Sequence, residues 1–163
     1  MRRNFNILSY KITRRLYYFR GRFSSLNMPM KRIILIIDDD IDDCQFLQEM
    51  LAEAGWKGNT YFRHEAGSAL LMLKNMQESE SLPSLIILDL ILPGIGGMDL
   101  LKTIKLLYPT IPVLMYSTTC DDELTWDARK HGAMDCLKKV ASHEENLRFA
   151  KHLLSLISQP PLH

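Results

Sequence analysis

The stretch S-L-I-I-L-D-L-I-L-P-G-I-G-G, residues 84–97, decides the fold class. The run Ser84–Leu88 is short and apolar, which is typical of a strand buried on both faces in a parallel sheet. Asp89 stands at the end of that run, where parallel sheets bind their ligands. The Pro93-Gly94 pair beyond it predicts a turn. Asp89 is therefore either a functional carboxylate or simply the cap of the following helix.

Apolar runs and helical patterns alternate along the rest of the chain. Strands are predicted at 32–37, 59–62, 85–88, 111–116 and 134–137, and helices at 41–54, 66–77, 98–107, 122–131 and 142–158. This alternation predicts right-handed βαβ units and an α/β fold with a doubly wound, five-stranded parallel sheet. We expect one domain at 31–159, followed by a short tail at 160–163.

The charge is distributed unevenly. The chain of 163 residues has 20 Lys and Arg against 19 Asp and Glu. Residues 1–30 contain seven of the basic residues and no acid, which leaves 13 basic against 19 acidic residues in the remainder. An acidic body argues against a nucleic-acid-binding surface on it.

The basic segment at 1–30 is expected to be a poorly packed extension. We favour a mis-called start, with translation beginning at Met28 or Met30, because the composition changes abruptly just before a strand. A nucleic-acid or anionic-membrane arm and a transit-like segment are the alternatives.

The cysteines and the hydropathy indicate the compartment. The three cysteines, Cys44, Cys120 and Cys136, match no metal-binding spacing and imply no disulfide framework. A reducing cytoplasm is therefore expected. No apolar stretch approaches the roughly 18 residues of a membrane helix, and the N-terminus lacks the apolar core of a secretory signal.

Side chains that can carry chemistry follow four of the predicted strands. In chain order they are Asp38 and Asp39, Asp89, Ser117 and Thr118, and Lys138 and Lys139. Carboxylates that converge at one sheet edge repel each other unless a cation joins them, and hard oxygen ligands suit Mg²⁺. A nearby hydroxyl and ammonium group supply what a phosphoryl group needs. The pattern predicts phosphoryl transfer to an Asp.

Each of these residues also has a plainer interpretation. Residues 38–40 fit a solvated turn or a helix cap, and Asp42 and Asp43 fit a charged helix face. Ser117 and Thr118 fit capping residues, and the two lysines fit an exposed strand end. Their joint occurrence at one edge favours the functional interpretation.

Four segments together resemble the receiver domain of two-component response regulators. They are I-L-I-I-D-D-D (34–40), L-I-I-L-D-L-I-L-P-G-I-G-G (85–97), P-V-L-M-Y-S-T (112–118) and C-L-K-K (136–139). The resemblance covers about residues 31–158. It implies a flavodoxin-like sheet with strand order 2-1-3-4-5 and helices on both faces.

The resemblance also implies a role for each site residue. Asp89 would be the phosphoacceptor, Ser117 the switch hydroxyl, and Lys139 the lysine that pairs with the phosphoryl group. Asp38 and Asp39 would bind Mg²⁺ together with Asp89 and the backbone carbonyl of Ile91.

Three positions depart from the family pattern. Val140 stands where a Pro usually follows the Lys, and Gly96 replaces an acid. Cys136 stands where the family usually has a switch aromatic, so Tyr116 is an alternative for that role. None of these departures removes a phosphorylation residue.

The function implied by the resemblance is that of a stand-alone response regulator, which is not an enzyme. It would take phosphate from a histidine kinase or phosphotransfer protein. It would dock an unknown downstream protein through the surface of residues 122–131, 134–137 and 142–158, with no nucleic-acid or membrane partner. One alternative is a pseudo-receiver that does not use phosphate. Another is an Asp-based phosphohydrolase of the haloacid-dehalogenase type, although Ile41-Asp42 do not match its nucleophile motif.

Overall fold

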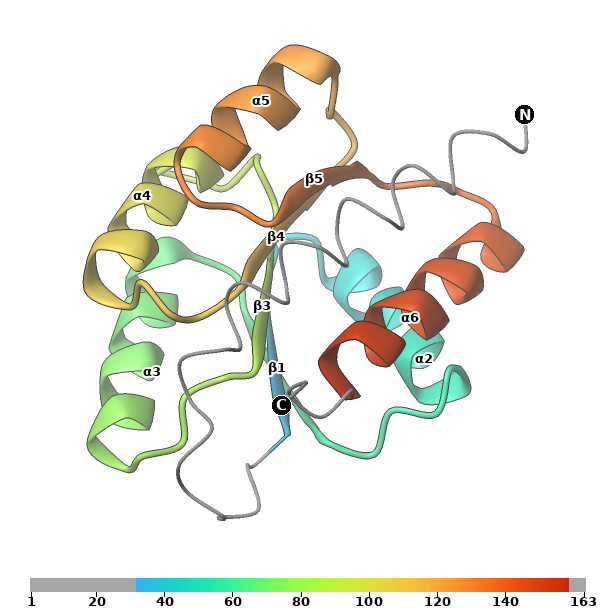
Figure 1. Ribbon diagram of the computed structural model, residues 1–163, viewed down its shortest axis with the longest axis horizontal. Helices are drawn as coiled ribbons and strands as arrows, with labels where there is room; N and C mark the ends of the chain where they lie inside the picture. Colours follow the sequence, from blue (N-terminus) through green and yellow to red (C-terminus); the bar gives the residue numbers. More distant parts are fainter. Residues whose placement is uncertain (1–31, 159–163) are drawn as a thin grey trace, which may run out of the picture.

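The computed structural model describes residues 32–158, in which strands and helices alternate (Figure 1). The strands are β1 (Ile33–Ile37), β2 (Asn59–Arg63), β3 (Leu85–Leu88), β4 (Val113–Ser117) and β5 (Asp135–Lys138). The helices are α2 (Ile41–Glu53), α3 (Ala66–Glu78), α4 (Gly97–Leu107), α5 (Asp122–Lys130) and α6 (His143–Ser158). The expected extension at 1–30 and the tail at 160–163 lie outside the described residues.

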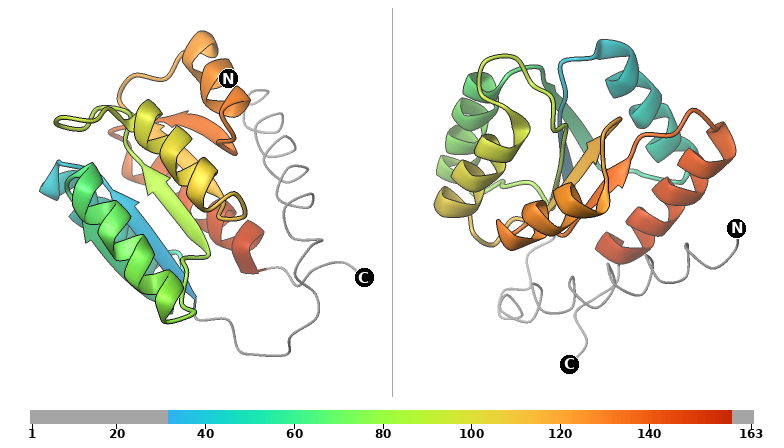
Figure 2. Two further views of the ribbon diagram at one scale, coloured as in Figure 1. Left: turned by 90° about the vertical axis from the view of Figure 1, so that its left-hand side faces the viewer. Right: turned by 90° about the horizontal axis from the view of Figure 1, so that it is seen from above.

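The five strands form one parallel sheet in the order β2-β1-β3-β4-β5. Helices α2 and α6 cover one face, and α3, α4 and α5 cover the other (Figures 1 and 2). This confirms the predicted doubly wound sheet and its strand order. Each parallel connection needs a helical crossover, which explains why helices separate all the strands.

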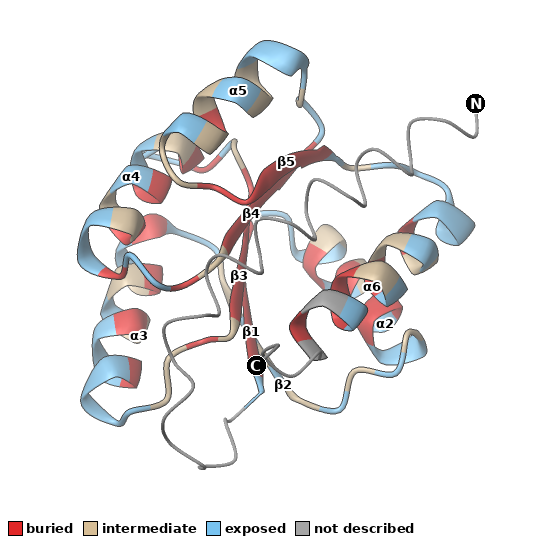
Figure 3. Cartoon of the chain, viewed as in Figure 1, coloured by how far each residue is buried: buried red, intermediate tan, exposed pale blue. Residues whose placement is uncertain are grey.

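The core consists of two apolar layers, one on each face of the sheet. In β1, Ile34 and Ile36 pack with α2 and α6, whereas Leu35 and Ile37 pack with the helices on the other face. Successive strand residues point to opposite faces, so a strand covered on both sides must be apolar throughout. The central strands are buried accordingly (Figure 3). Burial of each such aliphatic side chain contributes about 1.5–3 kcal/mol.

The strand register brings the site residues to one level. Ile37 pairs with Leu88, so Asp38 and Asp89 follow neighbouring strands at the same height. β4 was predicted to end at Tyr116, but it extends to Ser117, which pairs with Lys138. Such one-residue differences at strand ends are common. Here the shift makes Ser117 the last residue of a strand instead of part of the following loop.

Among residues 32–158, no helix combines the length and the apolar character that crossing a membrane requires.

Candidate functional site

The carboxyl ends of the strands bring together the side chains selected from the sequence. β1 ends just before Asp38, and β3 ends just before Asp89. One carboxylate oxygen from each of Asp38, Asp39 and Asp89 lies within 4.8 Å of the others. Lys139, beyond β5, reaches the same place, because its Nζ lies 2.6 Å from Asp38 Oδ2. We call Asp38, Asp39 and Asp89 the acidic cluster.

Asp38 is contacted on both sides of its carboxylate. Oδ1 accepts a hydrogen bond from the backbone N–H of Asp40 at 3.0 Å, and Oδ2 accepts from Lys139. The side chain is only 6% exposed. Burial raises the pKa of Asp38 above its usual value, although the hydrogen bond from Lys139 lowers it. Its negative charge is therefore costly, and a cation bound here would stabilise it.

Asp89 is positioned by the backbone around it. Oδ1 accepts a hydrogen bond from the N–H of Leu90 at 2.7 Å, and Oδ2 lies 3.5 Å from Lys139 Nζ. Helix α4 begins against this residue, because Gly97 has no side chain that would collide with the Asp89 carbonyl. The N-cap of α4 is Gly96. This excludes the alternative in which Asp89 serves as the cap.

Ser117 carries a buried hydroxyl whose hydrogen-bonding capacity is unused. The residue is 0% exposed, and its Oγ has no hydrogen-bond partner in the described part of the chain. Leaving such a group unsatisfied costs about 1–3 kcal/mol, so it calls for a specific explanation. Ser117 does not cap α5, because Asp121 does. A ligand at the strand ends would supply the missing partner.

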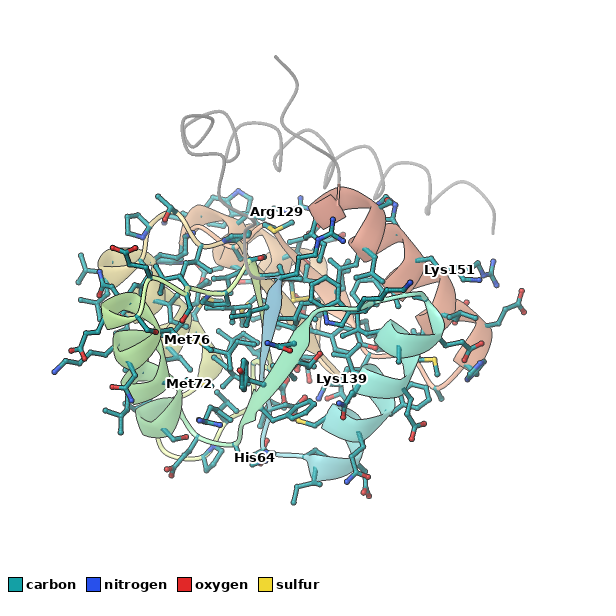
Figure 4. The ribbon with its side chains drawn as sticks, turned by 90° about the horizontal axis from the view of Figure 1, so that it is seen from below. His64, Met72, Met76, Arg129, Lys139 and Lys151 are labelled. Atoms are coloured by element: carbon teal, nitrogen blue, oxygen red, sulfur yellow. A yellow bond between two sulfur atoms is a disulfide. The ribbon has the colours of Figure 1, made fainter. Side chains whose placement is uncertain are left out.

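Lys139 is the cation of the site. Besides Asp38, its Nζ contacts Asp43 Oδ2 at 2.7 Å. Burial by itself lowers the pKa of Lys139, but the hydrogen bonds to Asp38 and Asp43 outweigh it and raise the pKa above its usual value. Lys138 is exposed, as expected from the alternation of side chains along a strand. Figure 4 labels Lys139 together with His64, which follows β2.

The donor set of the acidic cluster fits a hard divalent cation. Its ligating atoms are carboxylate oxygens, and Mg²⁺ takes such oxygens together with water and phosphate oxygens. Asp38, Asp39 and Asp89 would hold it. Ile91 lies in the loop after β3 and is 58% exposed; its aliphatic side chain has no ligand atom, so only its backbone carbonyl could bind the cation. That role for the Ile91 carbonyl remains a prediction.

Asp42 and Asp43, which were predicted to form a charged helix face rather than to bind a metal, differ in their contacts. Asp42 does lie on an exposed turn, but the carboxylate of Asp43 contacts Lys139 across 96 residues of sequence. Asp40 is the N-cap of α2, and its side chain accepts from the N–H groups of Asp42 and Asp43. Asp43 is thus at the third helical position, where an acidic side chain commonly takes part in capping.

Two further residues fix the loops of the site. His64 Nδ1 donates to the backbone carbonyl of Asp38 at 2.8 Å. Asn146, which is 1% exposed on α6, donates from Nδ2 to the carbonyls of Val140 at 2.6 Å and Ser142 at 3.1 Å. Asn146 therefore anchors the loop after Lys139, where Val140 replaces the usual Pro.

Tyr116 lies in the core on the side of α2 and α6. Its ring stacks on Phe149, with centroids 5.4 Å apart and an interplanar angle of 9°. Its hydroxyl donates to Asn146 Oδ1 at 2.6 Å. Burial raises the pKa of Tyr116 to about 12. A swing of Tyr116 to the surface would break both contacts, and the alternative switch role for it stays a prediction.

The expectation of no disulfide was also wrong. Cys120, in the loop between β4 and α5, is bonded to Cys136 of β5, and their Cα atoms are 6.1 Å apart. Cys44 is free and buried. The pair matches no spacing motif, and it forms because β4 and β5 are neighbours. Disulfides are rare in a reducing cytosol, so this bond is at odds with the compartment expected from the sequence.

The chain is similar to known signalling proteins. Residues 34–150 match the model of the response regulator receiver domain. The transcriptional regulatory protein ZraR of Escherichia coli (strain K12) is 35% identical over 106 residues, which is 65% of this chain and 22% of that protein. The match thus spans less than a quarter of the relative's length.

Solved structures show the same fold. The Mn(2+)-bound form of response regulator Rcp1 has a TM-score of 0.67 at 22% identity, and the match covers 81% of this chain and 99% of that one. The receiver domain of NtrX from Brucella abortus has a TM-score of 0.61 at 29% identity, with coverage of 75% and 98%. At 22% identity, the similarity to Rcp1 supports the fold alone.

Proposed function

Because the chain belongs to the family of response regulator receiver domains, we propose that it is a phosphorylation switch whose phosphoacceptor is Asp89. The observation that carries this proposal is the position of Lys139, whose Nζ lies 3.5 Å from the Asp89 carboxylate within the acidic cluster. A carboxylate faced by an ammonium group and by further carboxylates is suited to receive a phosphoryl group and to hold its charge.

The proposed reaction forms an acyl phosphate. An oxygen of Asp89 attacks the phosphorus of the donor, the bond from phosphorus to the leaving group breaks, and the leaving group keeps that electron pair. Lys139 then pairs with a phosphoryl oxygen, and the buried hydroxyl of Ser117 donates to another. The unused capacity of Ser117 Oγ supports this last step.

We propose Mg²⁺ as the resident cation, held by Asp38, Asp39, Asp89 and the backbone carbonyl of Ile91. When bound, it would neutralise charge on the carboxylates and the phosphoryl oxygens. The fit of the carboxylate donor set supports this assignment.

The proposed donor is a histidine kinase or phosphotransfer protein, and the proposed output is docking of a downstream protein on the surface of α5, β5 and α6. Trp126, which is 64% exposed on α5, supports a contact role for that surface. We propose that the protein works in the cytoplasm, where the Cys120–Cys136 bond would be exposed to reduction.

The stand-alone arrangement stays a prediction. The relative ZraR is named as a transcriptional regulatory protein and is several times longer than the matched region. The second arrangement is therefore a receiver within a longer regulator. The mass of the native protein in a cell extract, measured with an antibody to residues 32–158, separates the two arrangements.

We test the function by intact-mass spectrometry after incubation with acetyl phosphate, with and without Mg²⁺. We expect a Mg²⁺-dependent gain of one phosphoryl group that is lost in Asp89→Asn. The matched control is Asp99→Asn, because Asp99 is an exposed carboxylate at the start of α4, and it should gain the group normally.

Equal phosphorylation of Asp89→Asn would contradict the proposal. Failure of the wild-type protein both to bind Mg²⁺ and to gain the group would favour a pseudo-receiver. Multiple turnover of a generic phosphomonoester would instead indicate a phosphohydrolase.

A further inference from the structure

Lys139 is shared between a carboxylate of the acidic cluster and one outside it. Its Nζ contacts Asp38 Oδ2 at 2.6 Å and Asp43 Oδ2 at 2.7 Å, whereas Asp89 Oδ2 is at 3.5 Å. An ammonium group has three N–H donors. Two of them are therefore engaged, and the third is available on the side of Asp89.

The two engaged partners differ in what else they can bind. Asp38 belongs to the set of carboxylates that could hold one cation, and Asp43 does not. A carboxylate oxygen that binds a divalent cation is a poorer partner for an ammonium group, because the cation withdraws its charge and repels the ammonium. The ion pair between Asp43 and Lys139 can therefore persist when the Asp38 carboxylate binds a metal ion.

The geometry of α2 holds Asp43 in place for this contact. The side chain of Asp40 accepts from the N–H groups of Asp42 and Asp43 at 2.8 and 3.1 Å, which fixes the first turn. Asp43 is 42% exposed, and the Lys139 side chain that it contacts is 11% exposed. The ion pair is therefore shielded from water on one side, where it is stronger than a fully solvated pair.

Apart from its ion pairs with Asp38, Asp43 and Asp89, Lys139 is held only through the backbone. Its N–H donates to the carbonyl of Ser117 at 2.7 Å, and Asn146 holds the carbonyl of Val140. These bonds do not restrain the long flexible stem of the lysine, which has a high rotamer entropy.

We propose that Asp43 is a positioning residue, which keeps the ammonium of Lys139 over Asp89 when a cation occupies the acidic cluster. This inference rests on the proposed function of Asp89. Asp43 touches neither the phosphoryl group nor the cation, and it acts through Lys139 alone.

The test compares two substitutions that remove the same charge from the same turn. Asp43→Asn removes the contact, whereas Asp42→Asn removes a neighbouring exposed carboxylate that contacts neither Lys139 nor the acidic cluster within residues 32–158. The phosphorylation rate is measured against acetyl phosphate concentration at saturating Mg²⁺. We expect the maximal rate of Asp43→Asn to fall about tenfold with little change in the half-saturating donor concentration, because misplacement of a reacting group costs rate. Asp42→Asn should stay within about twofold of wild type.

A second readout does not depend on phosphorylation. In a ¹H–¹⁵N spectrum of the lysine ammonium groups, we expect the Lys139 signal to persist on addition of Mg²⁺ in wild type and to be lost in Asp43→Asn. Asp43→Glu should restore part of the signal and of the rate, which separates positioning from a general defect in folding.

Equal behaviour of Asp43→Asn and Asp42→Asn in both measurements would overturn the proposal. If the wild-type protein accepts no phosphoryl group, the proposed role of Asp89 as phosphoacceptor is contradicted. The spectra still decide whether Asp43 holds the ammonium group of Lys139.

Discussion

Lys139 and Asp38 stand 101 residues apart in the sequence and are joined by an ion pair of 2.6 Å. The pair crosses from the end of β5 to the end of β1, and it neutralises part of the charge of the acidic cluster. It lies beside Asp89 because the strands between β1 and β5 run parallel and end at the same edge.

Replacement of the Lys139 charge should destabilise the protein when Mg²⁺ is absent. Lys139→Gln leaves Asp38 and Asp89 buried without a cation, and we expect a loss of about 3 kcal/mol in the free energy of unfolding. Added Mg²⁺ should recover part of that loss, because it replaces the missing charge. Urea unfolding with and without Mg²⁺ measures both effects. Lys138→Gln, at the exposed neighbouring position, is the control and should change little.

The bulk of Ile91 should slow loss of the phosphoryl group. Ile91 and Thr119 are both exposed and stand two residues after Asp89 and Ser117, so we expect the water that hydrolyses the acyl phosphate to approach between them. Ile91→Asn supplies one hydrogen bond to that water, worth about 1.4 kcal/mol or tenfold in rate. The decay of phosphorylated protein, followed by intact mass, checks this. The control is Ile95→Asn, which alters an exposed isoleucine of the same loop and should leave the decay unchanged. Equal decay rates for Ile91→Asn and wild type would contradict the prediction.

Tyr116 should make the protein less stable at alkaline pH. Burial raises its pKa from 10.0 to about 12, so between these values the unfolded chain releases a proton that the folded chain retains. The free energy of unfolding therefore falls as pH rises through this window, by about 3 kcal/mol. Tyr116→Phe has no such proton, so the free energy of unfolding of this variant should fall less between pH 10 and 12, by that same amount. Denaturant titrations at a series of pH values give the free energy of unfolding at each pH. The same dependence of this free energy on pH in the two proteins would contradict the prediction.

Reduction of the Cys120–Cys136 bond should lower stability. A disulfide that closes a loop of this size, with a sequence separation of 16, stabilises by about 3 kcal/mol through the unfolded chain. We expect a reductant to decrease the free energy of unfolding by about that amount in wild type and to have no effect on Cys120→Ser. Alkylation of both cysteines in the untreated, unfolded protein would show instead that the bond is absent.

Much of the fold and of the site could be predicted from local patterns. The strands 33–37 and 85–88 are continuous apolar runs, and an acidic residue directly follows each of them. Parallel strands then place Asp38 and Asp89 together, whatever the loops between them contain. Ser117 and Lys139 follow from the same rule.

The contacts that escaped prediction depend on pairs far apart in the sequence. Asp43 and Asp42 are neighbours of identical chemistry, and only the position of Lys139 distinguishes them. Asn146 reads as an ordinary polar residue of a helix until the carbonyl of Val140 is placed beside it. The Cys120–Cys136 bond likewise depends on how the loop after β4 turns back toward β5.

The residue that carries the phosphoryl group can be identified chemically. Borohydride reduces an aspartyl phosphate to homoserine, which peptide mass spectrometry then locates. After phosphorylation with acetyl phosphate and Mg²⁺, we expect homoserine at position 89 and unchanged aspartate at Asp38 and Asp39. Homoserine at either of those two positions, or a phosphoryl group that borohydride does not remove, would contradict the assignment of Asp89 as the phosphoacceptor.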